Sequence, residues 1–461
     1  MNDTANKNPP QTPIALADSG DAITANVLER FKSGFEADPV NQTLLNAVTR
    51  TTIDEVALNR RVVAQTDHTF SHVLDDWTAT NQKASGRCWL FAGLNLLRTG
   101  VMQKMKLKDF EFSQNYILFW HKLERSNYFL EAILDTAERD IDDRTVAYLL
   151  DHPNDDGGQW TMFAGIIKKY GLLPKAFMPE TQSSSNTRRM NYVLTWKLRD
   201  GALKLRDLSS QGVGQSALRQ LKQKILDEIY RILCIHLGQA PARFTWQWQD
   251  TDRRFHRDPE LTPLEFAAKY LSADPDDYVC LVNDPRSASQ FGRTYTVNYL
   301  GNIVGANPVL YLNVEIDVMK AMAMETILAG EPVWFGCDMA QMTSRKLGLM
   351  DSSLYDLVGV YRINFELDKG ERLYLHQSHM NHAMLFTGVD VVAGKSRRWR
   401  VENSWGEEPG KKGFFTMSDN WFDEFVFEIA VNKSLLSREL RDSIEVKPKV
   451  LPPWDPMGSL A

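Results

Sequence analysis

A run of apolar residues that fits only in a protein interior stands in the first quarter of the sequence. Residues 89–97 (Trp-Leu-Phe-Ala-Gly-Leu-Asn-Leu-Leu) would be apolar on almost every side of a helix, and such a helix has to be buried. Gly86 lies just before the run, where a loop turns into a helix. The sequence therefore predicts a buried central helix, with Cys88 at its N-terminal end.

The order of the predicted elements indicates the fold class. Helical spacing of apolar residues is strongest in the stretch 187–238, and a capping box at Thr262-Pro263-Leu264-Glu265 starts a further short helix. Short β-rich runs follow, at 278–282, 309–314, 332–336, 383–389 and 399–403. Helices first and strands afterwards predict an α+β fold, not an alternation of strands and helices.

Composition excludes several classes of protein. The chain of 461 residues has a net charge of −6, so it lacks the excess of basic residues typical of a nucleic-acid-binding protein. It contains no apolar run long enough to span a membrane. Residues 1–22 are polar and lack the pattern of a signal peptide, so we expect a loosely docked or disordered tail and a cytoplasmic protein. Four scattered cysteines without CxxC spacing indicate neither a disulfide scaffold nor a zinc site.

Five residues could together carry nucleophilic catalysis. A helix N-terminus favours the thiolate form of Cys88, and the side-chain amide of Gln82 on the same loop could donate to an oxyanion. His382 begins the predicted strand 383–389 and could act as the base. Asn403, at the end of the next strand, could orient the imidazole, and Trp405 could shield that hydrogen bond. This is the Cys-His-Asn variant of a catalytic triad.

Four segments then carry a resemblance to a known family. They are Asn-Gln-Lys-Ala-Ser-Gly-Arg-Cys-Trp (81–89), Asn-His-Ala-Met (381–384), Val-Glu-Asn-Ser-Trp-Gly (401–406) and the C-terminal Pro-Trp-Asp-Pro-Met-Gly-Ser-Leu-Ala (453–461). With them the chain resembles papain-like cysteine peptidases, and most closely their bleomycin hydrolase/aminopeptidase C branch. The resemblance extends from about residue 25 to the end of the chain.

The resemblance implies a papain-like core with an insertion. In papain-like enzymes the histidine follows the cysteine by roughly 130–150 residues, and here the separation is about twice as long, which predicts a large helical insertion. In this branch such insertions mediate assembly into a hexamer. The expected segments are a tail (1–22), a helical extension (23–80), the helical subdomain (81–186), the insertion (187–277), the β subdomain (278–450) and a C-terminal arm (451–461).

The resemblance also implies an activity. The protein would be a cysteine aminopeptidase that acts on peptides with free N-termini and needs no cofactor. Its C-terminal arm would lie in the cleft, where the carboxylate of Ala461 would pair with the substrate amine. Gly157 and Gly158 would form the edge on which the substrate strand docks.

Three alternatives remain open. His376, His379 and His382 are spaced by three residues, which invites a zinc site, although no pattern such as His-Glu-x-x-His completes it. A papain-like endopeptidase would share the same catalytic residues. A non-catalytic nucleic-acid-binding or scaffold protein could use basic pairs such as Arg188-Arg189, but acidic residues intersperse them and a solvated face is the expectation. Nucleic acid is therefore not an expected partner.

Overall fold

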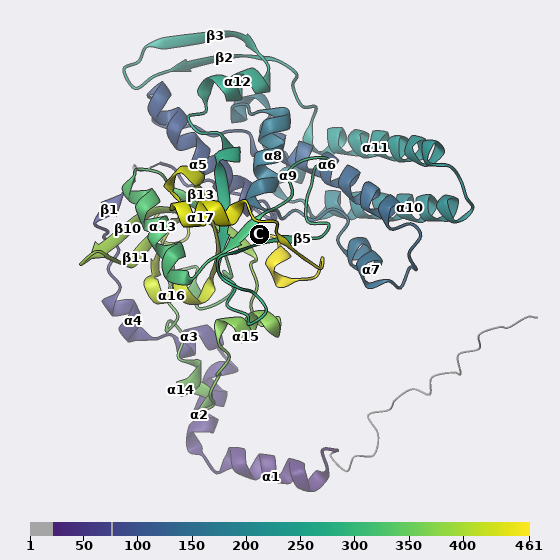
Figure 1. The fold of residues 1–461 in the computed structure, drawn as a ribbon. Helices are drawn as coiled ribbons and strands as arrows, with labels where there is room; N and C mark the ends of the chain where they lie inside the picture. The colour runs from purple at the N-terminus through teal and green to yellow at the C-terminus, as the bar shows by residue number, and fades with distance from the viewer. Residues whose placement is uncertain (1–21, 75–76) are drawn as a thin grey trace, which may run out of the picture. The chain divides into compact units, whose positions relative to one another are not determined.

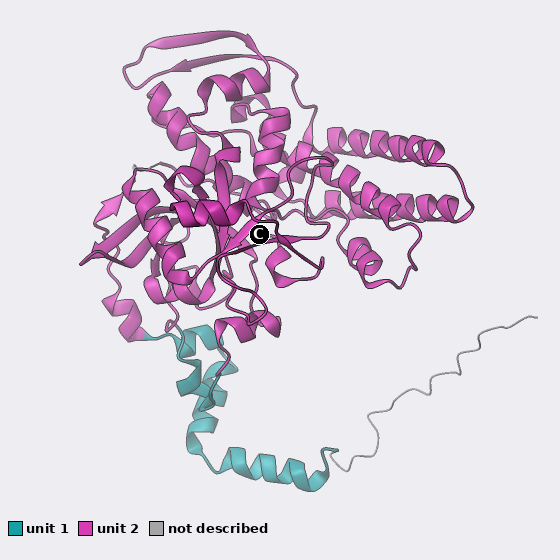
Figure 2. Ribbon diagram, in the orientation of Figure 1, with its two compact units in different colours: residues 1–59, 355–365 teal, residues 60–354, 366–461 magenta. Residues whose placement is uncertain are grey.

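The computed structural model describes residues 22–74 and 77–461, which divide into two units (Figure 2). The smaller unit combines the described residues up to 59 with residues 355–365. Its helices are α1 (Ala25–Glu36), α2 (Pro39–Val48), α3 (Ile53–Ala57) and α14 (Leu357–Tyr361). The backbone N–H of Asp356 donates to the carbonyl of Ala57 at 2.8 Å, which ties its two segments together. The predicted tail lies outside the described residues except for Ala22.

A sheet of twelve strands runs through the larger unit (Figure 1). Its order is β14-β5-β6-β4-β13-β7-β10-β11-β12-β9-β8, with β1 paired to β10. The strands are β1 (His72–Val73), β4 (Tyr278–Val282), β5 (Arg293–Val297), β6 (Tyr311–Asn313), β7 (Val333–Cys337), β8 (Thr343–Ser344), β9 (Leu349–Met350), β10 (His382–Val392), β11 (Lys395–Glu402), β12 (Phe414–Ser418), β13 (Val426–Asn432) and β14 (Lys449–Leu451). All five predicted β-rich runs lie in this sheet.

The central strand β10 is buried on both faces. Successive side chains of a strand point to opposite faces. Ala383 and Leu385 accordingly join the apolar cluster that contains α5 (Cys88–Met105), whereas Met384 and Phe386 join the cluster on the other face. Helices α13 (Ile316–Leu328) and α16 (Asp419–Phe425) belong to that second cluster. The sheet is thus the middle layer of an α+β fold, as the order of elements predicts.

Helix α5 is the buried helix that the apolar run predicts, and it extends further along the chain than residue 97. It ends at Met105, because Lys106 adopts a left-handed conformation with φ of 51°. Helices α6 (Gln114–Asp135) and α8 (Trp160–Tyr170) pack against α5, and α7 (Arg144–Asp151) packs against α6. Helix α8 ends before Gly171, which has a positive φ of 74°.

The segment expected as a helical insertion contains a hairpin as well as helices. Two long helices, α10 (Arg188–Ser210) and α11 (Gln215–Leu237), lie side by side (Figure 1). Strands β2 (Phe244–Gln249) and β3 (Phe255–Leu261) then form an antiparallel pair. The expectation of helix throughout this stretch is wrong there, because alternate side chains Phe244 and Trp246 are buried, a period of two. The capping box at Thr262 does start a helix, α12 (Pro263–Tyr270).

Short elements complete the larger unit. They are α4 (Arg60–Gln65), α9 (Gln182–Ser185), α15 (Lys369–Tyr374), α17 (Arg438–Ile444) and 3-10 turns at Lys175–Phe177, Pro275–Asp277, Lys433–Leu435 and Pro456–Gly458. Helical structure in the predicted extension therefore stops at Gln65, and His72–Val73 add a short strand to the sheet. In the part of the chain that the structure describes, no helix has the length and apolar character needed to cross a membrane.

Candidate active site

Cys88 is the first residue of α5 and is almost completely buried. The loop before it is fastened to the segment that precedes Gly157. The backbone N–H of Gly86 donates to a carboxylate oxygen of Asp156 at 3.1 Å, and the indole N–H of Trp89 donates to the carbonyl of the same residue at 2.8 Å. A Cβ on Gly86 would lie 2.8 Å from the Asp156 Cβ, so this close approach requires glycine. These contacts hold the thiol at the helix N-terminus.

His382 and Asn403 meet at the ends of two neighbouring strands. His382 begins β10, and Asn403 directly follows β11, its antiparallel neighbour. The imidazole Nε2 lies 2.9 Å from Asn403 Oδ1, which also accepts the backbone N–H of Ser404 at 2.7 Å. Because an amide oxygen only accepts, Nε2 carries the proton and Nδ1 is the basic nitrogen. The Trp405 ring lies 5.1 Å from the imidazole, centroid to centroid, and covers it.

Gln82 ties the cysteine loop to the strand end that carries Asn403. Its backbone N–H donates to the carbonyl of Ser404 at 2.8 Å, and its side-chain oxygen accepts from the Ser404 hydroxyl at 2.5 Å. Its side-chain N–H donates to the carbonyl of Ser85 at 2.5 Å. The Gln82 side chain is thereby oriented with its amide nitrogen on the side of the cysteine loop.

One cleft of about 680 Å³ unites these side chains. The residues that line it are Gln82, Gly86, Cys88, Tyr148, His152, Asp155, Gly157, His376, His379, Met380, Asn381, His382, Pro453, Trp454, Asp455, Pro456, Gly458, Ser459, Leu460 and Ala461. The thiol also accepts a hydrogen bond from the backbone N–H of Ala383, the residue after His382. The structure therefore brings Cys88, Gln82 and His382 into one cavity, with Asn403 and Trp405 behind the imidazole.

The C-terminal arm forms one side of this cleft, and two side chains fasten its middle. The guanidinium of Arg286 binds Asp455 and Asp284, each at 2.7 Å. Arg144 stacks over the ring of Trp454 at 4.0 Å. N-terminal to these contacts along the chain, β14 pairs with β5 in the sheet. The arm is thus part of the folded structure over its whole length.

The last residues of the arm are bound to the backbone of Gly158. The N–H of Gly158 donates to Ala461 and the N–H of Ala461 donates to Gly158, both at 3.3 Å, and Gln159 donates to the carbonyl of Ser459 at 2.6 Å. A Cβ on Gly157 would lie 2.7 Å from the Ala461 oxygen. The expectation that Gly158 docks a substrate strand is therefore corrected: both of its backbone groups already pair with the arm.

Comparison with known proteins identifies the family of this chain. Residues 22–458 match the model of the Peptidase C1-like family. The chain belongs to the Peptidase C1-like family. Aminopeptidase C of Listeria innocua is 42% identical over 439 residues, covering 95% of this chain and 99% of that protein. Bleomycin hydrolase of Rattus norvegicus is 42% identical over 435 residues, covering 92% and 96%.

A solved structure agrees with these relatives. The crystal structure of pepw from Lactobacillus rhamnosis is 45% identical, covers 96% of this chain and 100% of that one, and superposes with a TM-score of 0.94. The assignment to the bleomycin hydrolase/aminopeptidase C branch of the papain-like cysteine peptidases is confirmed. The protein is a cysteine-type hydrolase with an α+β papain-like fold.

Burial controls the ionisation of Cys88 and His382. It raises the pKa of the Cys88 thiol to about 11, although backbone hydrogen bonds from Ala383, Trp89 and Cys88 itself act in the opposite direction. It also lowers the pKa of His382 to about 4, against the hydrogen bond with Asn403, which raises it. The expectation that the helix N-terminus would make Cys88 a thiolate is thus incomplete, since desolvation outweighs the helix amides. Burial therefore disfavours both an isolated Cys88 thiolate and an isolated His382 imidazolium.

His376 and His379 line the cleft together with His382. Among residues 22–74 and 77–461, no group of three or more His, Cys, Asp or Glu side chains is arranged to hold a metal ion. His382 is instead hydrogen-bonded to Asn403. The zinc alternative therefore gains no support from the described residues.

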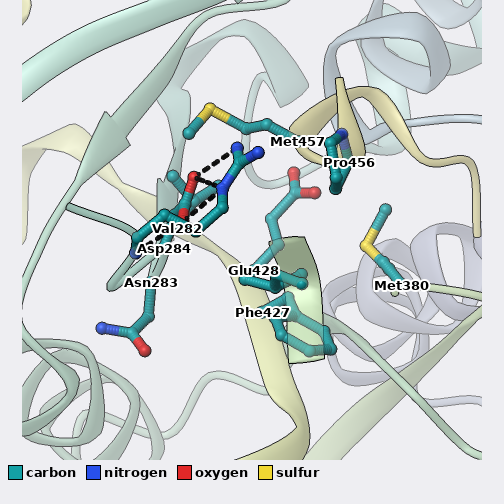
Figure 3. A pocket seen from close by; sticks show the side chains of 10 residues that line it. Val282, Asn283, Asp284, Met380, Phe427, Glu428, Pro456 and Met457 are labelled. Carbon is teal, nitrogen blue, oxygen red and sulfur yellow. Dashed lines mark hydrogen bonds and ion pairs between the residues drawn. The ribbon is translucent and has the colours of Figure 1, made fainter. Parts of the chain in front are cut away.

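A small cavity of about 30 Å³ lies behind the arm, next to the catalytic cleft (Figure 3). Met380 and Pro456 line both spaces. The floor of the cavity carries Glu428, which is buried and has one carboxylate oxygen without a hydrogen bond. Burial raises the pKa of Glu428 to about 8. The arm thus separates a buried, uncharged carboxyl group from the cleft.

Two acids with several hydrogen-bond donors around them escaped the sequence analysis at this site. Asp156 accepts from Lys122 at 2.7 Å, from Thr187 at 2.5 Å and from Asn191 at 2.7 Å, in addition to Gly86. Next to Asn403, Glu402 accepts from Arg98, Asn95 and Trp77. The partners of each acid are far away in sequence, so no local pattern could have revealed them.

Proposed function

We propose that Cys88 hydrolyses peptide bonds through a thioester intermediate. As a peptide fills the cleft, the thiol proton passes from Cys88 to Nδ1 of His382. This transfer creates two opposite charges side by side, which costs far less in a buried cleft than either charge alone. The sulfur then attacks the carbonyl carbon of the scissile bond. The backbone N–H of Cys88 and the free side-chain N–H of Gln82 stabilise the resulting oxyanion.

The second half of the cycle restores the enzyme. His382 gives its proton to the leaving amine as the carbon–nitrogen bond breaks, and the acyl group remains on sulfur. His382 then takes a proton from water, whose oxygen attacks the thioester carbon. The carboxylic acid leaves and the thiol regains its proton. Asn403 keeps the imidazole in the required tautomer throughout.

We further propose that the enzyme is an aminopeptidase. The observation that supports this most directly is the pairing of Ala461 with Gly158, since it closes the cleft on the side where a longer N-terminal stretch of substrate would lie. The terminal carboxylate would bind the α-ammonium group of the substrate, which a carboxylate recognises by charge and hydrogen bonding. The names of the relatives, aminopeptidase C and bleomycin hydrolase, agree with this proposal.

A pair of fluorogenic amides tests the proposal. Leucine 7-amido-4-methylcoumarin should be hydrolysed, and its N-acetylated form should not, because acetylation removes the charge that Ala461 would bind. A Cys88→Ala variant should retain the fold and lose the activity. Equal hydrolysis of both substrates by the full chain would contradict the aminopeptidase and favour the endopeptidase alternative. Near-normal turnover by the Cys88→Ala variant would contradict the mechanism.

Assembly into a hexamer is a further proposal, supported by exposed apolar side chains. Trp196 and Leu203 of α10 and Ile235 of α11 are exposed in the single chain. Large exposed apolar side chains mark interaction surfaces when they gather on one element. Sedimentation of the purified protein would reveal a hexamer, and a monomer at micromolar concentration would contradict it. The cytoplasmic location stays a prediction that cell fractionation can check.

A further inference from the structure

Apart from its histidines, the charged groups that line the cleft are all acidic. Carboxylates are contributed by Asp155, Asp455 and the terminal Ala461, and none of the described lining residues is Lys or Arg. Asp455 is already ion-paired with Arg286. Two carboxylates, those of Asp155 and Ala461, therefore face the cleft, where they attract a substrate with more than one positive charge.

Asp155 lies on the wall between the nucleophile and the end of the arm. The next residue, Asp156, contacts Gly86 and Trp89 on either side of Cys88, and two residues after Asp156, Gly158 binds Ala461. The backbone of Asp155 is fixed, because its carbonyl accepts from Lys122 at 3.1 Å. Its side chain remains 42% exposed, and a carboxylate oxygen lies 3.1 Å from His152 Nδ1.

The carboxyl group of Asp155 is ionised at neutral pH. Burial acts to raise its pKa, but the hydrogen bond from His152 and the charges of Arg125 and Lys122 outweigh burial and hold the pKa below its usual value. Arg125 does not reach into the cleft, since its guanidinium is buried and donates to the carbonyl of Gly301. An anion therefore stands on the wall of the cleft between the Cys88 loop and the end of the arm.

We propose that Asp155 makes this enzyme selective for peptides whose first residue is Lys or Arg. The inference rests on the proposed aminopeptidase function. The terminal carboxylate of Ala461 binds the α-ammonium group, and Asp155 binds the ammonium or guanidinium of the first side chain. A charge pair in a partly enclosed cleft raises the preference for the charged side chain by roughly tenfold.

His152 makes this selectivity depend on pH. The hydrogen bond with Asp155 raises the pKa of His152, as do the charges of Asp155 and Asp151, whereas burial and Arg125 lower it. Below that pKa the imidazolium neutralises part of the Asp155 charge, and above it the carboxylate is free to pair with the substrate. The other charges facing this pair are Lys122 and the Ala461 carboxylate. The preference for a basic first residue should therefore increase as the pH rises through the pKa of His152.

Matched substrates and variants test the inference. Lysine and norleucine 7-amido-4-methylcoumarin share the same unbranched hydrocarbon side chain, and lysine adds only the terminal ammonium. We expect the full chain to favour lysine in kcat/KM, and Asp155→Asn to reduce the lysine-to-norleucine ratio by roughly tenfold. Asp151→Asn removes the same charge four positions earlier, outside the residues that line the cleft, and should preserve the ratio. His152→Gln should remove the pH dependence of the lysine-to-norleucine ratio. The titration of the substrate α-amine does not affect this ratio, because both amides carry the same α-amine.

The outcomes separate the inference from the function on which it rests. Suppose that norleucine amide is hydrolysed, but the lysine-to-norleucine ratio is below one, or is the same in the full chain and in Asp155→Asn. The selectivity role of Asp155 is then wrong, while the proposed aminopeptidase function stands. If neither amide is hydrolysed, the proposed function fails and the inference fails with it. A ratio that falls equally in Asp151→Asn would show a general charge effect and also contradict the role of Asp155.

Discussion

Asp156 joins three parts of the chain, and its replacement by asparagine should destabilise the protein strongly. One carboxylate oxygen accepts from Lys122 and Asn191, and the other accepts from Gly86 and Thr187. An asparagine has only one oxygen, so in either orientation two of these donors lose their acceptor. The Lys122 ammonium, whose side chain is completely buried, would also lose its counter-charge.

The magnitude follows from that buried ammonium. Removing one partner of a buried ion pair costs about 3–5 kcal/mol, because the remaining charge is left uncompensated. The effect should also depend on pH. Lys122 and the hydrogen bonds hold the pKa of Asp156 well below its usual value, in spite of burial, which raises it. A depressed pKa contributes stability above the unfolded-state value, near 3.8, and that contribution is lost as the pH falls below it.

Urea denaturation of the variants measures this effect. Asp156→Asn should lower the free energy of unfolding by about 3–5 kcal/mol at pH 7, whereas Asp155→Asn, the same change at a half-exposed neighbour, should lower it by less than about 1 kcal/mol. In the double variant Lys122→Met/Asp156→Asn no buried charge is left unpaired, so the loss should be smaller than the sum of the two single losses. A loss below about 1 kcal/mol in Asp156→Asn, or strict additivity in the double variant, would refute the reasoning.

Three further predictions concern the arm, the reacting pair and the buried acid behind the arm. Arg286→Met should leave Asp455 unpaired and loosen the arm, so hydrolysis of N-acetyl-leucine amide should increase relative to hydrolysis of leucine amide. An unchanged ratio of the two rates would show that the position of the arm does not depend on this ion pair. Alkylation of Cys88 by uncharged iodoacetamide requires His382 to be neutral, so its rate should persist in weak acid and fall as the pH drops through about 4; a fall centred near 6.5 would contradict the lowered pKa. Burial raises the pKa of Glu428 to about 8, so wild-type stability should decline as the pH rises from about 4.5 to 8. Glu428→Gln should lack this decline in melting temperature, and an equal decline in both proteins would show that another group is responsible.

Much of the fold and most residues of the candidate site could be predicted from local patterns. The apolar run after Cys88, the strand after His382 and the capping box at Thr262 are each encoded within a few neighbouring residues, and all three elements form as expected. The hairpin at 244–261 was missed because it follows two long helices. The alternation of aromatic residues in β2 extends over so few residues that the segment can be taken for part of a helical stretch.

The sequence by itself determined which residue types are available for the chemistry: a cysteine at the start of a buried helix, a histidine and an asparagine at strand ends, and an arm that ends in Ala461. Only the tertiary structure decided how these groups are charged and which of them remain free. Desolvation of Cys88 depends on every element around the cleft, and the pairing of Gly158 with Ala461 joins residues about 300 positions apart. Burial and long-range pairing are properties of the packed chain, so no local pattern contains them.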